Sequence, residues 1–203
     1  LINSLHHPVL DVFFKYITHL GDGLILLLFL PIIYFKKSAY GLNLSLGALI
    51  HFLFIILTKR LLFRGAHRPM LVFEDMSLHL VEGVKIALYN TFPSGHTATA
   101  FLIAAILAQT KARQPLYQFF IFSLALLVGI SRVYLMQHFL LDVLAGMWIG
   151  YSSFFLAKNI TLTFPHSWRH FRLNHFIYLK IRLGFSALKR RIHSYDYRHR
   201  RLK

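Results

Sequence analysis

The chain has 203 residues, of which 56% are hydrophobic, 15% are charged and none is cysteine. This balance is too apolar for an ordinary soluble domain of this length and is typical of a membrane protein. Without cysteine, disulfide frameworks, thiolate zinc sites and cysteine nucleophiles are excluded. Much of the net charge of +16 lies beyond Lys158, and a basic segment after apolar runs favours an anionic membrane surface over nucleic acid as its partner.

Five apolar runs follow one another along the chain and predict an all-α fold, a polytopic transmembrane helix bundle of about five to six membrane helices plus interfacial helices. Several runs are shorter than the ~20 residues that cross a hydrocarbon core of about 30 Å, which predicts helices that end inside the protein beside a polar site. A soluble helical bundle is the alternative, and the composition disfavours it. The runs are residues 20–35, 39–58, 97–109, 115–130 and 140–157.

The sequence predicts three regions. Residues 1–19 mix apolar and polar side chains and are expected to form an interfacial segment on the outer face, while residues 20–160 form the membrane bundle. Residues 161–203 form a basic cytoplasmic tail, which is either an amphipathic helix on an anionic leaflet or a disordered extension. A removed leader or a further spanning helix before Leu1 would complete this topology.

Basic residues are placed unevenly between the runs. If each run crosses once, Lys36, Lys111 and Arg113 share one side with the tail, and the positive-inside rule makes that side cytoplasmic. A second basic group, within residues 59–68, falls on the opposite side and violates the rule. An anion site on the outer side explains this exception.

The tetrapeptide Pro93-Ser94-Gly95-His96 stands directly before the third apolar run. Ser94 and Gly95 are therefore expected at a helix N-terminus, where free N–H groups and the positive end of the helix dipole attract phosphate. His96 follows them and can protonate a leaving oxygen, since imidazole titrates near neutral pH. Taken alone, the tetrapeptide is also compatible with an ordinary helix cap.

A second group comprises Ser131, Arg132, His138 and Asp142. His138 and Asp142 are four residues apart, so on a helix they share a face and can form a hydrogen bond. A carboxylate on one ring nitrogen fixes the tautomer and leaves the other nitrogen free to attack. Asp142 is also an ionisable group at the start of a membrane helix, where function is the default explanation. The alternative is an ordinary capping or surface pair.

The third group is basic and consists of Lys59, Arg60, Arg64 and Arg68, which follow the second run. Phosphoryl transfer spreads negative charge over three oxygens, and guanidinium forks are well suited to stabilise it. A basic flank that extends its charges to the membrane interface is the alternative.

Together the three groups resemble the type 2 phosphatidic acid phosphatase superfamily, whose pattern is K-x6-R-P, then P-S-G-H, then S-R-x5-H-x3-D. The second and third motifs match completely. The first departs from the pattern, because Leu61 stands seven residues before Arg68 where the family has lysine. We assign that role to Lys59, with Arg60 and Arg64 as alternatives.

The resemblance implies a phosphatase that uses neither a metal nor another cofactor. His138 would attack phosphorus and form a phosphohistidine, Asp142 would orient it, and His96 would protonate the leaving alcohol before water hydrolyses the intermediate. The implied phosphate-binding residues are Lys59, Arg68, Ser94, Gly95 and Arg132.

A site at the outer ends of membrane helices predicts a substrate whose phosphate lies at head-group depth while its chains stay in the bilayer. Members of the resembled family act on phosphatidic acid, phosphatidylglycerophosphate, undecaprenyl diphosphate and lipid A phosphates. We expect a bacterial inner-membrane protein with its site facing the periplasm or the outside, and loop 70–92 is the candidate for head-group selection, although it can equally be a solvated connector.

Three other functions are compatible with the same motifs. A phosphotransferase of this family would pass the phosphoryl or head group to a lipid or sugar acceptor instead of water. A vanadium haloperoxidase has the same motif set but is soluble, which the apolar runs disfavour. A non-enzymatic lipid carrier or membrane scaffold is disfavoured by the intact set of His96, His138 and Asp142.

Overall fold

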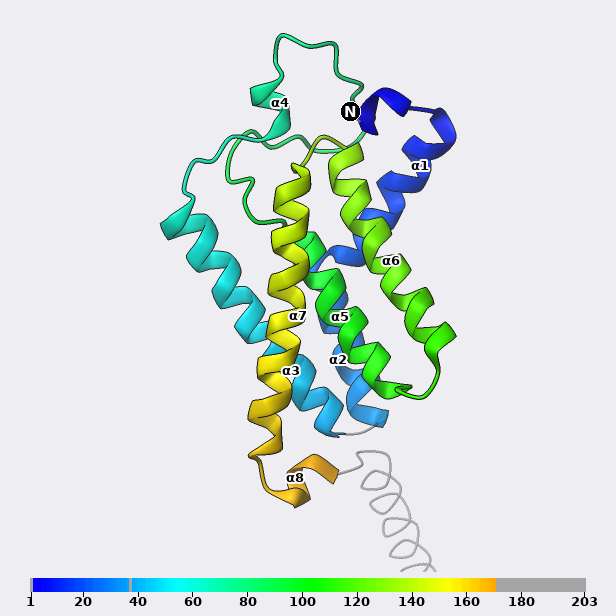
Figure 1. Cartoon of the computed structure of the whole chain (residues 1–203), viewed down its shortest axis with the longest axis vertical. Coiled ribbons are helices and arrows are strands. Elements are labelled where there is room, and N and C mark those ends of the chain that lie inside the picture. The colour runs from blue at the N-terminus through cyan, green and yellow to red at the C-terminus, as the bar shows by residue number, and fades with distance from the viewer. Residues whose placement is uncertain (1, 37, 171–203) are drawn as a thin grey trace, which may run out of the picture.

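The computed structural model describes residues 2–36 and 38–170, which form an elongated bundle of helices (Figure 1). Within this part of the chain no strand forms, and His67 and Tyr89 make an isolated β-bridge. The α-helices are α1 (Pro8–Ile17), α2 (Gly23–Lys36), α3 (Ser38–Ile56), α4 (Pro69–Val72), α5 (Gly95–Thr110), α6 (Pro115–Tyr134), α7 (Leu140–Leu162) and α8 (His166–His170). Two 3₁₀ turns, η1 (Ile2–Leu5) and η2 (Thr18–Gly21), and one π-helical turn, η3 (Leu57–Leu62), complete them.

Helix α5 forms the centre of the bundle and packs against α3, α6 and α7. It is rich in alanine and threonine, and eleven of its sixteen residues are buried. Helix α7 presents glycine where it meets α5: a Cβ atom on Gly146 would lie 2.5 Å from the Ser94 carbonyl oxygen, and one on Gly150 would lie 2.3 Å from that of Ala98. Small residues thus let the two backbones touch, as is common between membrane helices.

Each of the five predicted apolar runs forms a helix, so the predicted fold class is confirmed. Within the described chain, three helices are long and apolar enough to cross a membrane: α3 with its π-helical extension, α6 and α7. Pro8–Gly21 and Gly23–Phe35 meet at a bend of 57° and form a fourth candidate span if the two helices together cross the membrane once. The three or four candidate spans are fewer than the five to six membrane helices predicted. The main difference is α5, which has only 16 residues and is enclosed by other helices.

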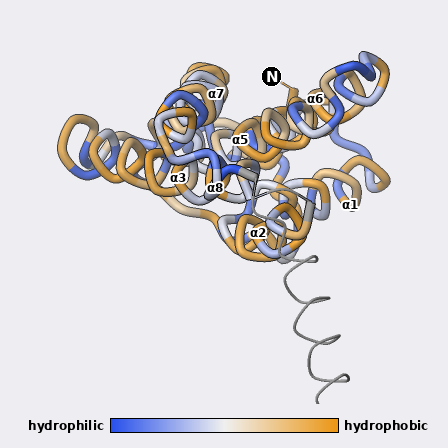
Figure 2. The backbone as a smooth tube through the Cα atoms, turned by 90° about the horizontal axis from the view of Figure 1, so that it is seen from below, coloured by the Kyte–Doolittle hydropathy of each residue, from blue (hydrophilic) through white to orange (hydrophobic). Residues whose placement is uncertain are grey.

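Large hydrophobic side chains are exposed on α2, α3, α6 and α7, and the backbone tube in Figure 2 is hydrophobic along much of these helices. Trp148, near the middle of α7, has 72% of its surface exposed. An apolar surface of this extent is stable only against lipid. The protein is therefore a multi-pass membrane protein.

The N-terminal segment packs against the helices of the bundle. Helix α1 packs against α6, and η2 packs against both α5 and α6. Gly21 makes this approach possible, since a Cβ atom there would lie 2.6 Å from the carbonyl oxygen of His96. At the other end, α7 continues to Leu162 and α8 follows it, whereas the predicted tail beyond residue 170 lies outside the described residues.

The segments that carry the three sequence motifs lie at one end of the bundle. The C-terminal ends of α3 and α6, the N-terminal ends of α5 and α7, and the long connection that contains α4 all lie there, as Figure 1 shows. The first turn of α5 is recessed below the ends of α6 and α7 (Figure 1). The opposite end carries α8 and the α5–α6 turn, which contains Lys111 and Arg113.

Candidate active site

The recessed N-terminus of α5 forms the floor of the site. Ser94 is the N-cap of α5, and its hydroxyl accepts hydrogen bonds from the Thr97 amide at 3.4 Å and the Thr97 hydroxyl at 2.8 Å. The Ser94 amide donates to the backbone oxygen of Asp142 at 3.0 Å, which ties α5 to the start of α7. A Cβ atom on Gly95 would meet nothing within 4 Å. The open space over Gly95 and the free N–H groups of the first turn fit an anion.

His138 and Asp142 form the buried pair that their spacing predicts. Nδ1 of His138 lies 3.3 Å from Oδ2 of Asp142, and the side chains are 2% and 4% exposed. Asp142 Oδ2 also accepts hydrogen bonds from the Phe139 amide at 2.9 Å and from the Thr91 hydroxyl. These contacts hold the carboxylate and leave Nε2 of His138 available.

The charge state of His138 follows from its surroundings. Burial is the largest effect and lowers its pKa well below the usual value, and the cations Arg68, Arg132 and Lys59 lower it further, while Asp142 opposes them. The ring is therefore neutral at physiological pH. A neutral imidazole has the lone pair that a nucleophile requires.

Arg68 and Arg132 meet at one buried amide, Gln137. Arg68 Nη1 donates to the backbone oxygen of Gln137 at 2.8 Å and to its Oε1 at 3.2 Å, and Arg132 Nη2 donates to the same Oε1 at 3.5 Å. Arg132 Nη1 also donates to the Thr18 hydroxyl at 2.8 Å. Its Nε is buried and has no hydrogen-bond partner among the described residues, so this donor is available to a phosphate oxygen.

Lys59 lies in the π-helical turn η3, where the amide of Phe63 donates to the Thr58 oxygen five residues earlier. This wider turn is the bulge that the shifted lysine requires. Nζ of Lys59 donates to the Asn90 oxygen at 3.1 Å, whereas Arg60 and Arg64 are exposed.

His96, in the first turn of α5, has a carboxylate partner that its motif does not predict. Its Nε2 lies 2.8 Å from Oδ1 of Asp22, which follows η2. The other oxygen of Asp22 lies 2.7 Å from Nδ1 of His19.

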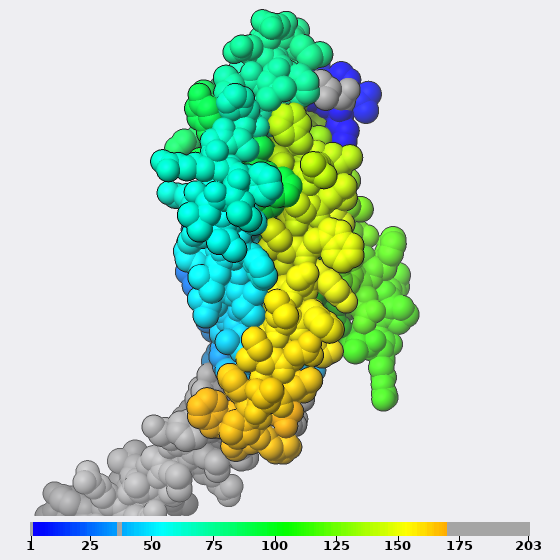
Figure 3. All heavy atoms as spheres, turned by 60° about the vertical axis from the view of Figure 1, so that its left-hand side comes forward, coloured from blue at the N-terminus to red at the C-terminus, as the bar shows by residue number. Residues whose placement is uncertain are grey.

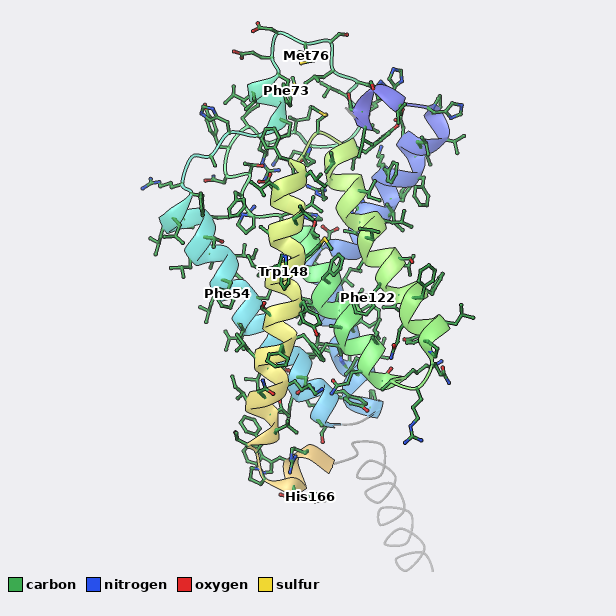
Figure 4. The ribbon with its side chains drawn as sticks, viewed as in Figure 1. Phe54, Phe73, Met76, Phe122, Trp148 and His166 are labelled. Carbon is green, nitrogen blue, oxygen red and sulfur yellow. The ribbon has the colours of Figure 1, made fainter. Side chains whose placement is uncertain are left out.

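Two of the predicted cations lie close enough to act on both predicted histidines. Lys59 and Arg132 act electrostatically on both His96 and His138, although the four residues come from η3, α6, α5 and the α6–α7 connection. Above them, Phe73 at the end of α4 packs against Phe139 with ring centroids 6.0 Å apart. Figure 4 shows Phe73 and Met76 in the outer connection at this end of the bundle.

The sequence motifs did not identify Thr91, Gln137, Thr18 or Asp22, which hold the side chains described above. Asp22 carries a signal that could have revealed it, because it is an ionisable residue directly before an apolar run, as Asp142 is. Within the described residues no three His, Asp or Glu side chains form a group that could hold a metal ion.

The structure is thus a membrane-embedded helical bundle with two histidines and several cations around the N-terminus of α5. A family model described as the PAP2 superfamily matches residues 25–165. The chain belongs to this superfamily.

Curated relatives from bacteria are similar to the chain. The lipid A 4'-phosphatase of Porphyromonas gingivalis is 28% identical over 160 residues, which cover 73% of this chain and 65% of the relative. Phosphatidylglycerophosphatase B of Bacillus subtilis is 38% identical over 78 residues, which cover 34% of this chain and 38% of the relative. The chain thus spans less than two thirds of either relative.

Two crystal structures share the fold. Aquifex aeolicus LpxE superposes with a TM-score of 0.66 at 31% identity, with 80% of this chain and 91% of that chain covered. The first transmembrane PAP2 type phosphatidylglycerolphosphate phosphatase from Bacillus subtilis gives a TM-score of 0.51 at 28% identity, with 81% and 83% covered.

Proposed function

We propose that the protein is a membrane phosphatase that hydrolyses a lipid phosphate without a metal, through a phosphohistidine on His138. The observation that carries this proposal is the buried pair of His138 and Asp142, which shares its cations with His96. A neutral imidazole held by a carboxylate, beside a second imidazole and several cations, contains each group that phosphoryl transfer to histidine needs.

His138 and His96 account for both steps of the proposed reaction. Nε2 of His138 forms a bond to phosphorus while the bond between phosphorus and the lipid oxygen breaks, and His96 gives its proton to that oxygen. Water then attacks phosphorus, its proton passes to His96, and the P–N bond breaks. Inorganic phosphate leaves, and both imidazoles return to their starting states.

Side-chain cations and backbone N–H groups stabilise the transferring phosphoryl group. Arg68, Arg132 and Lys59 supply the charge, and the first turn of α5 at Gly95 supplies N–H donors. The Ser94 hydroxyl accepts hydrogen bonds from Thr97 and keeps its own proton to donate to a phosphate oxygen, while the Ser94 amide fixes that turn to α7.

Lipid is the substrate class that the surroundings of the site favour. An apolar groove of about 590 Å³ runs between α3 and α7 and is lined by Leu57, Leu61 and Leu156, among others. Figure 3 shows α3 and α7 side by side on this face. The groove reaches the turn that carries Lys59, so a lipid can lie there with its phosphate in the site. The similarity to a lipid A 4'-phosphatase and to LpxE makes lipid A phosphate our first candidate substrate, with phosphatidylglycerophosphate and undecaprenyl diphosphate next.

The distribution of basic residues supports a bacterial inner-membrane location. The end of the bundle opposite the site carries Lys111 and Arg113, and the positive-inside rule places it in the cytoplasm. The site then faces the periplasm, with residues 161–203 as the cytoplasmic tail.

The test is release of inorganic phosphate from lipid A, phosphatidylglycerophosphate and undecaprenyl diphosphate by purified protein in detergent with EDTA. We expect the wild type to act on at least one of them and His138→Ala to have no turnover. With substrate labelled at the reacting phosphate, a rapid quench should trap label that is lost in acid, as a phosphoramidate is. Activity abolished by EDTA, or full activity of His138→Ala, would refute the proposal.

A further inference from the structure

A second histidine–carboxylate pair lies beside the nucleophilic pair and is supplied by the N-terminal segment. Asp22 stands in extended conformation between η2 and α2, and its Oδ1 lies 2.8 Å from Nε2 of His96. Its Oδ2 lies 2.7 Å from Nδ1 of His19. Both carboxylate oxygens are therefore bonded to imidazoles, and the Asp22 side chain is 36% exposed.

We propose that Asp22 is a positioning residue for His96, the general acid and base of the proposed reaction. This inference rests on the proposed function. The carboxylate occupies Nε2 and so leaves Nδ1 as the nitrogen that exchanges a proton with the substrate. The nucleophilic pair has the reverse arrangement, because Asp142 binds Nδ1 of His138 and leaves Nε2 for attack.

A carboxylate at this position serves both halves of the reaction. Before the P–O bond breaks, it stabilises the protonated ring of His96, and after proton transfer it keeps the ring in one tautomer and one orientation. It takes no proton itself. Burial is the largest effect on His96 and, together with the cations Arg132 and Lys59, lowers its pKa to about 4, while Asp22 opposes them. Loss of the Asp22 charge would therefore disfavour the protonated ring further.

The backbone around Asp22 is built to hold this contact. Gly21 packs so closely on His96 that a Cβ atom would lie 2.9 Å from the His96 Cβ atom and 2.6 Å from its carbonyl oxygen. Three residues before Gly21, the Thr18 hydroxyl accepts the hydrogen bond from Arg132. The turn η2 thus supports a phosphate-binding residue and the general acid from one short segment.

Asp22→Asn tests the proposal because it removes the charge and keeps the shape. On a lipid phosphate, whose alkoxide is a poor leaving group, we expect kcat to fall at least 10-fold with KM changed less than 3-fold. On 4-nitrophenyl phosphate, whose leaving group needs no proton, the first-turnover release of 4-nitrophenol should slow less than 3-fold, although the later hydrolysis of the phosphohistidine still uses His96. Lys111→Gln removes an exposed charge at the opposite end of the bundle and should leave both rates unchanged. Equal loss on the two substrates would overturn the proposal.

The double variant separates positioning from a structural role. In a His96→Ala background, Asp22→Asn should reduce the residual rate less than 2-fold, because its effect passes through His96. An additive loss would mean that Asp22 acts elsewhere, and normal activity of Asp22→Asn would refute its role while leaving the proposed phosphatase intact.

A measurement without turnover completes the test. In protein with ¹⁵N-labelled histidine, the wild-type ring of His96 should carry its proton on Nε2, and Asp22→Asn should give a mixture of tautomers. The same tautomer in both proteins would overturn the proposal even if the substrate remains unknown.

Discussion

Thr91 stabilises the carboxylate of Asp142, which holds the proposed nucleophile His138. Its hydroxyl donates to Oδ2 of Asp142 and lies 3.4 Å from Nδ1 of His138, and the residue is 4% exposed. A valine at this position would fill the same space and leave the buried Asp142 oxygen with fewer donors. The loss of a buried hydrogen bond to a charged group costs about 1.5–3 kcal/mol.

We therefore expect Thr91→Val to lower kcat/KM for the lipid substrate about 10-fold, measured as steady-state phosphate release. Thr110→Val is the matched control, since Thr110 bonds only within its own helix to the Leu107 oxygen at the far end of α5. The same loss in both variants would contradict a role for Thr91 at the site.

The depressed pKa of His138 also predicts how stability depends on pH. Because the folded-state pKa lies below the unfolded value of about 6.5, the unfolded chain binds the proton first as the pH falls. Stability is therefore complete above pH 6.5 and is lost below it, by about 1.4 kcal/mol for the first full pH unit in which only the unfolded state is protonated. His138→Asn removes this contribution.

Thermal unfolding in detergent at pH 8 and pH 5.5 measures the effect. The wild-type Tm should fall further than that of His138→Asn, by about 2–4 °C for each kcal/mol. The contributions of the other histidines cancel in the difference between the two proteins. An identical fall in both would show that His138 is not held neutral.

Among the single elements, the π-helical turn η3 directs Lys59 toward the proposed site. The π-helical turn carries Lys59 toward Asn90, while Leu61 is 71% exposed and lines the apolar groove. The site thus receives a lysine nine residues before Arg68. A lysine at position 61, which is the spacing of the family pattern, would extend into the groove.

Lys59→Ala should consequently lower kcat/KM about 100-fold or more, as expected for one cation removed from a desolvated phosphoryl site. Adding Leu61→Lys to this variant should restore less than a tenth of the lost activity. Arg60→Ala, which removes a neighbouring exposed cation, should change kcat/KM less than 3-fold. Recovery by Leu61→Lys would show that the turn can rewind into an ordinary α-helix.

Sequence reasoning succeeded where the decisive spacing is local. His138 and Asp142 pair because they are four residues apart, and Ser94 caps α5 because it precedes the apolar run. Sequence reasoning missed contacts between distant segments. Asp22 and His96, for example, are 74 residues apart in the chain but form a hydrogen-bonded pair. The bend between η2 and α2 that places Asp22 there has no short-range signal in the sequence.

At the scale of the whole molecule, contacts between distant segments also explain why the structure has fewer candidate membrane spans than the sequence predicted. Hydropathy identified α5 as one apolar run among five, but its enclosure by α3, α6 and α7 is a property of the assembled bundle. A buried helix need not match the thickness of the bilayer, so α5 is short and begins below its neighbours. Its recessed N-terminus places the proposed anion site below the ends of α6 and α7.

The α5–α7 contact therefore couples stability to the geometry of the site. Gly146 and Gly150 lie one turn apart on α7, and both touch α5 backbone oxygens, but only Gly146 faces the oxygen of Ser94 at the site. Alanine at either position forces the helices apart, and such overpacking costs about 1–3 kcal/mol. Each variant should lose about 2–4 °C of Tm for each kcal/mol.

Activity should distinguish the two glycines. Gly146→Ala displaces the turn that presents Gly95 and His96, so kcat/KM of the folded protein should fall at least 10-fold, whereas Gly150→Ala should lose less than 3-fold at a similar loss of Tm. Gly23→Ala is the control, because a Cβ atom there meets nothing within 4 Å, and it should change neither quantity. If both α7 variants lost activity only in proportion to the unfolded fraction, the contact would support the fold without setting the site.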